Sequence, residues 1–260
     1  MTILDTIAKS TRKRVEAAKR ILSLAEIKRQ AEALPADTGF PFEKALAAPG
    51  LSFICEVKRA SPSKGLIAAD FPYLQIAREY EAAGAAAVSV LTEPEFFLGE
   101  PDYLREIARA VKIPALRKDF IVDEYQIYEA KAWGASAVLL ICALLPPAAL
   151  AASVKLCDRL GLSALVEAHT EGEVSAAVQA DARVIGVNNR DLKTFTVDLN
   201  IGRRLRPLIP PHALFVSESG IHTADDVRAL TEIGADAALI GEAMMRAADK
   251  GAYLERLRAI

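Results

Sequence analysis

The chain has 260 residues, of which 52% are hydrophobic and 25% are charged. This composition supplies a large apolar core and excludes an intrinsically disordered chain. Lysine and arginine together number 32 against 34 aspartates and glutamates, so the formal net charge of −2 argues against a general nucleic-acid-binding protein. The length allows one to three domains, because a single α/β barrel alone fills about 250 residues.

The first 50 residues are predicted to be a helical extension. Residues 3–34 are typical of one or two helices, and the turn-rich segment 37–42 follows them. The extension either caps the fold or acts as a lid over one end of it. It has no apolar stretch long enough for a secretory signal, and the most apolar run of the chain, residues 137–152, is short and interrupted by two prolines. We therefore expect a soluble cytoplasmic protein.

Beyond the extension, predicted strands alternate with predicted helices. Short apolar runs indicate eight strands, at residues 52–58, 86–93, 113–120, 136–143, 163–168, 183–190, 213–220 and 236–243. Helical patterns follow each of them, at residues 72–84, 101–111, 123–134, 146–161, 170–180, 197–209, 223–234 and 243–260. The first residues of the last pattern, 243–246, are also a candidate for a short extra helix.

A repeated plan supports this alternation. At Gly84, Gly134 and Gly234 a helical stretch ends in Gly-Ala and an apolar strand follows. These glycines are spaced by multiples of about 25 residues, the size of one βα unit. Glycine at such a place suits the end of a helix, where a positive φ is needed.

The predicted fold is α/β, a (β/α)8 TIM barrel. Several strands are apolar almost throughout, as parallel strands are when helices cover them. We expect residues 1–260 to form a single (β/α)8 barrel domain, with residues 1–50 as its N-terminal helical extension. A doubly wound open sheet is the alternative, but no GxGxxG or Walker A loop supports a nucleotide-binding version of it.

Polar side chains gather where the predicted strands end, which is where a barrel carries its active site. Any one of them could be a solvated or paired loop residue. Glu56 and Lys58 lie two positions apart and so point to the same face, as do Asn188 and Arg190. Lysines and glutamates brought to one rim, with Lys118 and Glu167 at other strand ends, offer general acids and bases.

The ends of the last two strands predict a phosphate site. They carry Ser219-Gly220 and Gly241-Glu242, and phosphate groups in such barrels bind there to backbone N–H groups. Glycine also serves plain turns, so each pair alone is a weak signal. Phe97 and Phe120 follow two neighbouring strands and suit an apolar pocket for an aromatic substrate, although core packing is the more common role of a single phenylalanine.

Cysteine and histidine spacing indicates neither a disulfide framework nor a metal site. The three cysteines form no CxxC pair, and Cys55 and Cys142 lie in apolar runs where buried, inert thiols are expected. The histidines lack metal-ligand spacing. The residues concerned are Cys55, Cys142, Cys157, His169, His212 and His222.

Seven motifs contain the polar, glycine and phenylalanine residues singled out at the strand ends. They are CEVKRASPSKG (55–65), VLTEPEFFLG (90–99), LRKDFIVDEYQIYEA (116–130), LVEAHTEGE (165–173), IGVNNRDLKTF (185–195), VSESGI (216–221) and IGEAMM (240–245). Together they resemble the indole-3-glycerol-phosphate synthase family of the tryptophan pathway. They stand in that family's order and span essentially the whole chain. The first motif, with its KxxSPS pattern, is the most specific.

The resemblance implies an enzyme that converts 1-(2-carboxyphenylamino)-1-deoxyribulose 5-phosphate to indole-3-glycerol phosphate, releasing carbon dioxide and water, with no metal or organic cofactor. It implies catalytic roles for six residues, with Lys118 as the general acid of ring closure. They are Glu56, Lys58, Lys118, Glu167, Asn188 and Ser219. The implied substrate contacts are Ser61, Phe97, Phe120, Arg190, Glu218, Gly220, Leu239, Gly241 and Glu242.

The resemblance leaves open which of Lys58, Glu56 and Glu167 donates the proton in the dehydration. Glu242 is expected to contribute its backbone, because its carboxylate would repel a phosphate. We expect a monomer that binds this small substrate and neither nucleic acid nor a membrane. Neighbouring phosphosugar barrels, such as phosphoribosylanthranilate isomerase, are not expected to carry both EVKRASPS and RKDF. A catalytically silent barrel would lack one of the rim charges, and none is missing.

Overall fold

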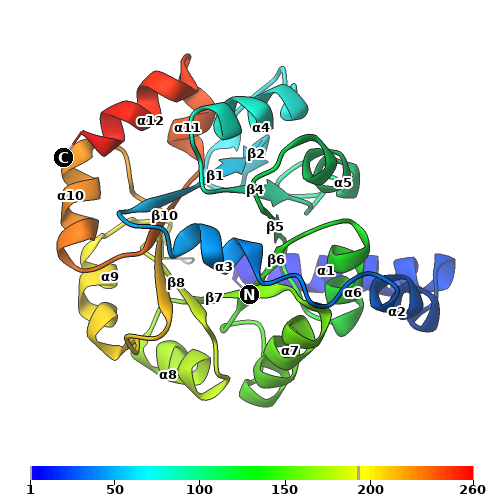
Figure 1. Cartoon of the computed structure of the whole chain (residues 1–260). Coiled ribbons are helices and arrows are strands. Elements are labelled where there is room, and N and C mark those ends of the chain that lie inside the picture. The colour runs from blue at the N-terminus through cyan, green and yellow to red at the C-terminus, as the bar shows by residue number, and fades with distance from the viewer. Residues whose placement is uncertain (1, 192–193, 260) are drawn as a thin grey trace.

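Eight parallel strands close into a barrel in which each strand pairs with its neighbour in the chain and the last returns to the first (Figure 1). The computed structural model describes residues 2–191 and 194–259. Four residues lie outside the described ones. They are Met1 of the predicted extension, Leu192 and Lys193 of the motif at 185–195, and Ile260 at the end of the last predicted helix. The barrel strands are β1 (Ser52–Val57), β4 (Ala87–Leu91), β5 (Ala115–Lys118), β6 (Ala137–Ile141), β7 (Ser163–Ala168), β8 (Val184–Asn188), β9 (Leu214–Glu218) and β10 (Ala237–Ile240). The (β/α)8 prediction is confirmed and the open-sheet alternative is wrong.

Helices surround the barrel and follow its strands in turn (Figure 1). They are α4 (Tyr73–Ala82), α5 (Pro101–Ala110), α6 (Glu124–Ala132), α7 (Pro147–Leu160), α8 (Glu171–Gln179), α9 (Asn200–Leu205) with the 3-10 turn η1 (Arg206–Leu208), α10 (Ala224–Glu232), α11 (Glu242–Arg246) and α12 (Lys250–Arg258). The glycines of the repeated plan follow the ends of α4, α6 and α10 with φ values of 79°, 88° and 73°. Their predicted role at helix ends is therefore confirmed.

Alternating side chains divide the core into two layers. In β1, Phe53, Cys55 and Val57 pack outward among the helices, whereas Ile54 points into the barrel. The barrel interior is filled by small and branched side chains from all eight strands. They are Ile54, Ala87, Leu116, Ala137, Leu139, Ile141, Leu165, Val184, Val216, Ala237 and Leu239.

The N-terminal extension reaches both ends of the barrel. It forms α1 (Ile3–Ile21), α2 (Leu24–Glu32) and α3 (Pro41–Leu46). In Figure 1, α3 lies across the barrel opening, and its buried Phe42 and Leu46 pack onto the barrel interior. At the other end, the beginning of α1 borders the pocket described below. The extension thus caps one end and lines the mouth of the other.

The structure corrects the predicted turn at residues 37–42. Pro41 and Phe42 begin α3, because a proline in the first helical turn gives up no hydrogen bond that the helix needs. A two-stranded hairpin of β2 (Ala60–Ser61) and β3 (Gly65–Leu66), which the sequence did not predict, lies in the loop after β1.

The last predicted helix, residues 243–260, is two helices in the structure. Lys250 donates hydrogen bonds to the carbonyl oxygens of Met245 and Ala247, which ends α11. Asp249 then caps α12 by accepting a hydrogen bond from the backbone N–H of Ala252. The short extra helix expected at 243–246 is present as α11.

Most strands end earlier than predicted because polar side chains bind the turning backbone. After β4, the carboxylate of Glu93 accepts backbone hydrogen bonds from Glu95, Phe96 and Phe97, so the chain turns there.

Within residues 2–191 and 194–259, no helix has the length and hydropathy needed to cross a membrane.

Replacing Leu46 in α3 tests whether the cap stabilises the barrel. Leu46 is fully buried against the barrel interior, so Leu46→Ala should lower the free energy of unfolding by about 3 kcal/mol. Urea denaturation measures this loss. Leu34→Ala, at a leucine that is 41% exposed, is the matched control, and an equal effect of both substitutions would contradict the role of α3.

Candidate active site

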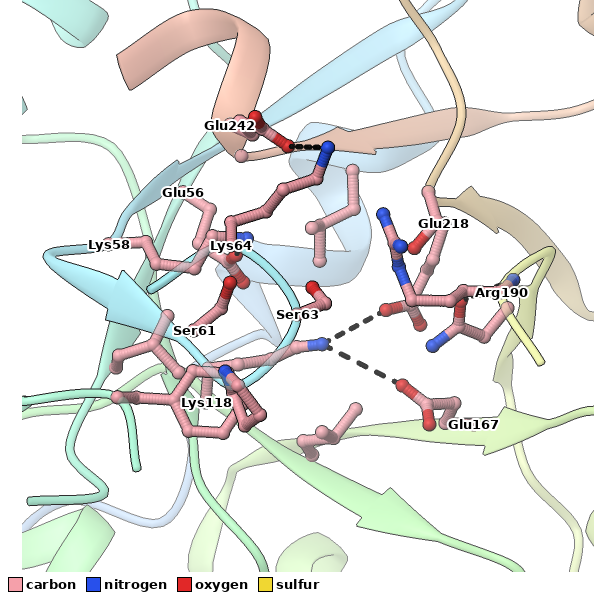
Figure 2. A pocket seen from close by; sticks show the side chains of 18 of the residues that line it. Glu56, Lys58, Ser61, Ser63, Lys64, Lys118, Glu167, Arg190, Glu218 and Glu242 are labelled. Carbon is pink, nitrogen blue, oxygen red and sulfur yellow. Dashed lines mark hydrogen bonds and ion pairs between the residues drawn. The ribbon is translucent and has the colours of Figure 1, made fainter. Parts of the chain in front are cut away.

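The carboxyl ends of the strands surround one pocket that contains every predicted site residue (Figure 2). Strand alternation explains this, because the last inward position of five strands is polar, while the inward position two residues before it has no polar side chain. The predicted residues along the pocket wall are Glu56, Lys58, Ser61, Phe97, Lys118, Phe120, Glu167, Asn188, Arg190, Glu218, Ser219, Gly220, Leu239, Gly241 and Glu242.

Lys118 stands at the end of β5 and points into the pocket (Figure 2). Its Nζ lies 3.1 Å from Glu218 Oε2 and 3.7 Å from Glu167 Oε2. Burial alone would lower the pKa of Lys118, but the carboxylates of Glu218, Glu167 and Glu56 outweigh it and raise that pKa above its ordinary value. The lysine is therefore a charged donor held in place by carboxylates.

Glu56 and Lys58 form a second charged pair on β1 and the loop after it. Lys58 Nζ lies 2.7 Å from Glu56 Oε1, and the buried Ser89 hydroxyl donates a hydrogen bond of 3.2 Å to Glu56 Oε2. Burial would raise the pKa of Glu56, but the ammonium groups of Lys58 and Lys118 lower it below its ordinary value. Glu56 is thus a carboxylate near neutral pH.

Glu218, at the end of β9, is the carboxylate with the most unusual proton affinity. Its Oε1 is buried and has no hydrogen-bond partner within the described part of the chain. Burial raises the pKa of Glu218 to about 7, and the nearby carboxylates of Glu167 and Glu56 add to the effect, while Lys118 opposes it. Gly186 on β8 makes room for this group, since a Cβ there would lie 2.3 Å from Glu218 Oε1.

Glu218 should make stability fall as pH rises. Its folded-state pKa of about 7 exceeds its ordinary value of 4.5, so unfolding releases a proton between these values and stability is lost as pH rises through 7. Glu218→Gln should remove up to about 1 kcal/mol per pH unit of that slope. Urea denaturation between pH 5 and 8 measures it, with the exposed Glu232→Gln as control. Identical slopes in wild type and Glu218→Gln would contradict the assignment.

Side-chain hydrogen bonds join the carboxyl ends of β8 and β9 beside the pocket. Asn189, which is fully buried, donates from Nδ2 to the backbone oxygens of Glu218 and Ser219 at 3.0 and 3.3 Å. Asn188 Oδ1 accepts the backbone N–H of Arg190 at 3.0 Å. Asn189 therefore fixes the chain on which Asn188, Arg190 and Ser219 stand.

The backbone at Ser219 and Gly220 has an uncommon conformation. Their φ values are 67° and 86°, which places both in the left-handed region. A Cβ on Gly220 would also lie 2.5 Å from Val197 Cγ1. Gly241 allows a similarly close approach, because a Cβ there would lie 2.7 Å from both Glu56 Oε1 and Lys58 Nζ. Gly220 thus combines a positive φ with a close contact, whereas at Gly241 a side chain would displace the ends of Glu56 and Lys58.

The Glu242 carboxylate is held between two cations. Its Oε2 lies 3.6 Å from Lys64 Nζ, as the dashed line in Figure 2 marks, and its Oε1 accepts a hydrogen bond of 3.1 Å from Arg246 Nε. Burial would raise the pKa of Glu242, but Arg246 and Lys64 lower it. The charge of Glu242 is thus largely neutralised beside the pocket.

One wall of the pocket is apolar. The rings of Phe97 and Phe120 lie 5.8 Å apart between centroids, and Ile3, Leu4 and Ile7 of α1 complete this side. The predicted aromatic pair is therefore present. The α1 residues were missed, because an amphipathic pattern predicts burial but does not say against what a helix face packs.

Below Lys118, a buried ion-pair network joins α1 to β5. Asp119 accepts hydrogen bonds from Arg14 Nη2 at 2.7 Å and from Arg117 Nη2 at 3.0 Å. Arg117 is 1% exposed, binds Glu129 Oε2 at 3.1 Å, and lies 4.2 Å from the ring of Trp133. Burial would raise the pKa of Asp119, but Arg117 and Arg14 hold it well below its ordinary value.

The sequence assigns no role to several other residues of the site. Ser63 and Lys64 lie inside the first motif and line the pocket, and Phe195 lies in the loop after β8. Their motifs were the available signal. Ser89 and Asn189 act behind the pocket residues. Asn189 belongs to the polar end of the sixth predicted strand, whereas nothing in β4 distinguishes Ser89 from a core position.

The described residues contain no group of three or more His, Cys, Asp or Glu side chains arranged to hold a metal ion. Cys55 and Cys157 are buried, and Cys142 is half-buried. Burial raises the pKa of Cys55 and of Cys142 to about 12, so both remain thiols near neutral pH.

The family model described as "Indole-3-glycerol phosphate synthase" matches residues 4–257. The chain belongs to the indole-3-glycerol phosphate synthase family. A protein of that name from Ruminiclostridium cellulolyticum is 57% identical over 256 residues, covering 98% of each chain. One from Endomicrobium trichonymphae is 52% identical over 258 residues, covering 99% of each chain. The family assignment made from the motifs is confirmed, and with it a decarboxylating lyase of tryptophan biosynthesis that acts on a small molecule.

Solved structures with low sequence identity support the barrel fold of this family member. A 3-hexulose-6-phosphate synthase has a TM-score of 0.64 at 16% identity and covers 80% of this chain and 99% of its own. A chain of the tryptophan synthase complex from Pyrococcus furiosus has a TM-score of 0.59 at 15% identity, with 80% and 98% covered. These likenesses concern the fold alone.

Proposed function

We propose that this pocket converts 1-(2-carboxyphenylamino)-1-deoxyribulose 5-phosphate to indole-3-glycerol phosphate, as the family name implies. The observation that carries the proposal is the Lys118 ammonium held among Glu218, Glu167 and Glu56 beside an aromatic wall. The reaction forms one C–C bond and releases carbon dioxide and water. One proton is taken up overall, because the carboxylate leaves as neutral carbon dioxide.

Ring closure is the step we assign to Lys118. The aromatic carbon that bears the carboxylate attacks the ribulose carbonyl carbon, and negative charge builds on the carbonyl oxygen. An ammonium group that is already oriented lowers the barrier by donating a proton to that oxygen. The pairing of Lys118 with Glu218 at 3.1 Å supplies this orientation. Loss of carbon dioxide then returns the bonding electrons to the ring and restores its aromaticity.

Dehydration needs one acid and one base. The hydroxyl leaves with a proton as water, and the carbon next to the nitrogen gives its proton to a base. We assign these transfers to Lys58, Glu56 and Glu167. The 2.7 Å contact between Lys58 and Glu56 keeps an acid and a carboxylate side by side. Asn188 and Ser219 orient the hydroxyl groups of the substrate.

Different parts of the pocket bind the two ends of the substrate. Phe97, Phe120 and Leu239 contact the aromatic ring, and Arg190 and Ser61 contact charged groups of the substrate. The phosphate lies at Gly220, Gly241 and the backbone of Glu242, where the glycines permit close approach. The cations around Glu242 reduce the repulsion that its carboxylate would exert on a phosphate.

Inorganic phosphate should therefore compete with the substrate. Gly220→Ala introduces a Cβ at a φ of 86° and close to Val197, so it should raise the inhibition constant of phosphate about tenfold. Steady-state inhibition measures this. Gly172→Ala is the control, because a Cβ on Gly172 meets no atom within 4 Å. Inhibition by phosphate that is unaffected by Gly220→Ala would argue against this cradle.

The assembly and location of the protein belong to the same proposal. We propose one domain spanning residues 1–260, with residues 1–50 as its extension, acting as a monomer in the cytoplasm. One copy of the chain supplies all the residues of the proposed site, and this supports the proposal of a monomer. Sedimentation at working concentration tests this proposal, and a dimer that loses activity on dilution would oppose it.

The direct test of the reaction is conversion of the synthetic substrate by purified protein in the presence of EDTA. The fluorescence of the indole product should appear with time, without any added metal. A well-folded protein that produces no indoleglycerol phosphate would refute the proposal and would favour a barrel that only binds its ligand.

A further inference from the structure

His169 lies directly behind the pocket carboxylate Glu167. It follows β7 by one residue and stands two positions after Glu167 in the chain. Its Nε2 is 3.7 Å from Glu167 Oε1. This nitrogen is buried and has no hydrogen-bond partner within the described part of the chain. His169 is not among the residues that line the pocket, and Glu167 is the pocket residue with which its ring makes an ion pair.

The other side of the imidazole faces a second carboxylate. His169 Nδ1 lies 3.5 Å from Glu173 Oε2 on α8, and the backbone N–H of His169 donates a hydrogen bond of 2.6 Å to the same oxygen. The ring is thus bracketed by Glu173 toward the surface and Glu167 toward the pocket. A carboxylate near each ring nitrogen stabilises the protonated imidazole.

The remaining carboxylate near His169 acts in the same direction. Glu218 on β9 adds a third negative charge, while Cys142 lies nearby as a neutral thiol that donates to the backbone oxygen of Glu173. Burial would lower the pKa of His169, but Glu173, Glu167 and Glu218 outweigh it and raise that pKa. Lys118 Nζ lies 3.7 Å from the other oxygen of Glu167, Oε2, as the dashed line in Figure 2 marks.

We propose that His169 is a positioning residue that orients Glu167 and adds a positive charge beside it, by presenting an imidazolium to its Oε1. This inference rests on the proposed function, in which Glu167 takes part in proton transfer. Glu167 has Lys118 on one side and His169 on the other, so its carboxylate is fixed in position between two cations. Of the two cations, only Lys118 lines the pocket, so His169 stays beside Glu167 when Lys118 turns to a substrate.

The variant His169→Gln removes the positive charge of the imidazolium and keeps a polar side chain in its place. Its amide keeps a donor near the place of Nε2 but carries no positive charge. Because a positive charge beside the pocket carboxylates is lost, the acidic limb of the kcat/KM profile should move up by about one pH unit. We expect kcat at pH 7 to fall about tenfold, with KM changing less than about twofold because His169 does not touch the substrate.

Two further variants complete the test. Glu173→Gln keeps the acceptor for the backbone N–H of His169 but withdraws the charge that stabilises the imidazolium. It should move the acidic limb in the same direction, and less than additively in combination with His169→Gln. His212→Gln, at an exposed turn residue before β9, is the control and should leave the profile unchanged.

Thermal unfolding of each variant distinguishes positioning from simple packing. A displaced acidic limb with a Tm within about 2 °C of wild type supports the inference. An unmoved limb in His169→Gln overturns it, whether or not kcat or the Tm falls. Absence of synthase activity in the wild-type protein would refute the proposed function instead, so the two failures are distinguishable.

Discussion

Lys118→Met should reduce kcat at least about 10³-fold while the protein keeps its fold. Methionine has nearly the same length as lysine but cannot donate a proton, so the carbonyl oxygen loses its acid during ring closure. General acid catalysis and stabilisation of the developing oxyanion each contribute about 10²-fold or more. Steady-state kinetics by indole fluorescence measure the loss.

Binding should survive this substitution better than turnover. The aromatic wall and the phosphate cradle do not depend on Lys118, so the dissociation constant of a substrate analogue should change much less than kcat. The exposed Lys155→Met is the control for the loss of one lysine. A Lys118→Met enzyme with kcat near that of wild type would remove Lys118 from the mechanism.

Arg117→Met should cause the largest loss of stability among single substitutions outside the pocket. Arg117 points outward from β5, between the strand and α6, and neutralises Asp119 and Glu129. Removing one partner of a buried ion pair costs about 3–5 kcal/mol, because the remaining charge stays buried. We therefore expect the free energy of unfolding to fall by about 4 kcal/mol.

Arg105→Met is the matched control for this loss. Arg105 also stacks on Trp133, at 4.8 Å, but its side chain is 40% exposed and its partner Asp102 lies at the surface. Exposed pairs of this kind contribute about 0–1 kcal/mol. Equal destabilisation in urea by Arg105→Met and Arg117→Met would mean that the stacking on Trp133, not the buried charges, explains the effect.

The sequence was informative about the site because strand periodicity and motif order agree. A two-residue period on parallel strands puts Glu56, Lys118, Glu167, Asn188 and Glu218 at one end of the barrel, and this could be foreseen without coordinates. The repeated glycines at helix ends made the βα plan visible. Both signals depend only on residues that are near one another in the chain, so they can be recognised in the sequence.

Features that depend on contacts between distant segments could not be foreseen. The pairing of Arg14 with Asp119 spans 105 residues, and no local pattern on α1 indicates that partner. The turn predicted before β1 became α3, because Phe42 and Leu46 gain burial only against a closed barrel. The last predicted helix is divided into α11 and α12, because the side chain of Asp249 caps the beginning of α12 although the helical pattern continues through it.

Product stoichiometry tests the central claim most directly. Purified protein in EDTA would be given a known amount of 1-(2-carboxyphenylamino)-1-deoxyribulose 5-phosphate, labelled in its carboxyl group. We predict one indole-3-glycerol phosphate and one labelled carbon dioxide for each substrate consumed, with both lost together in Lys118→Met. Substrate that binds but stays intact, or label that remains in the product, would contradict the proposed chemistry of this pocket.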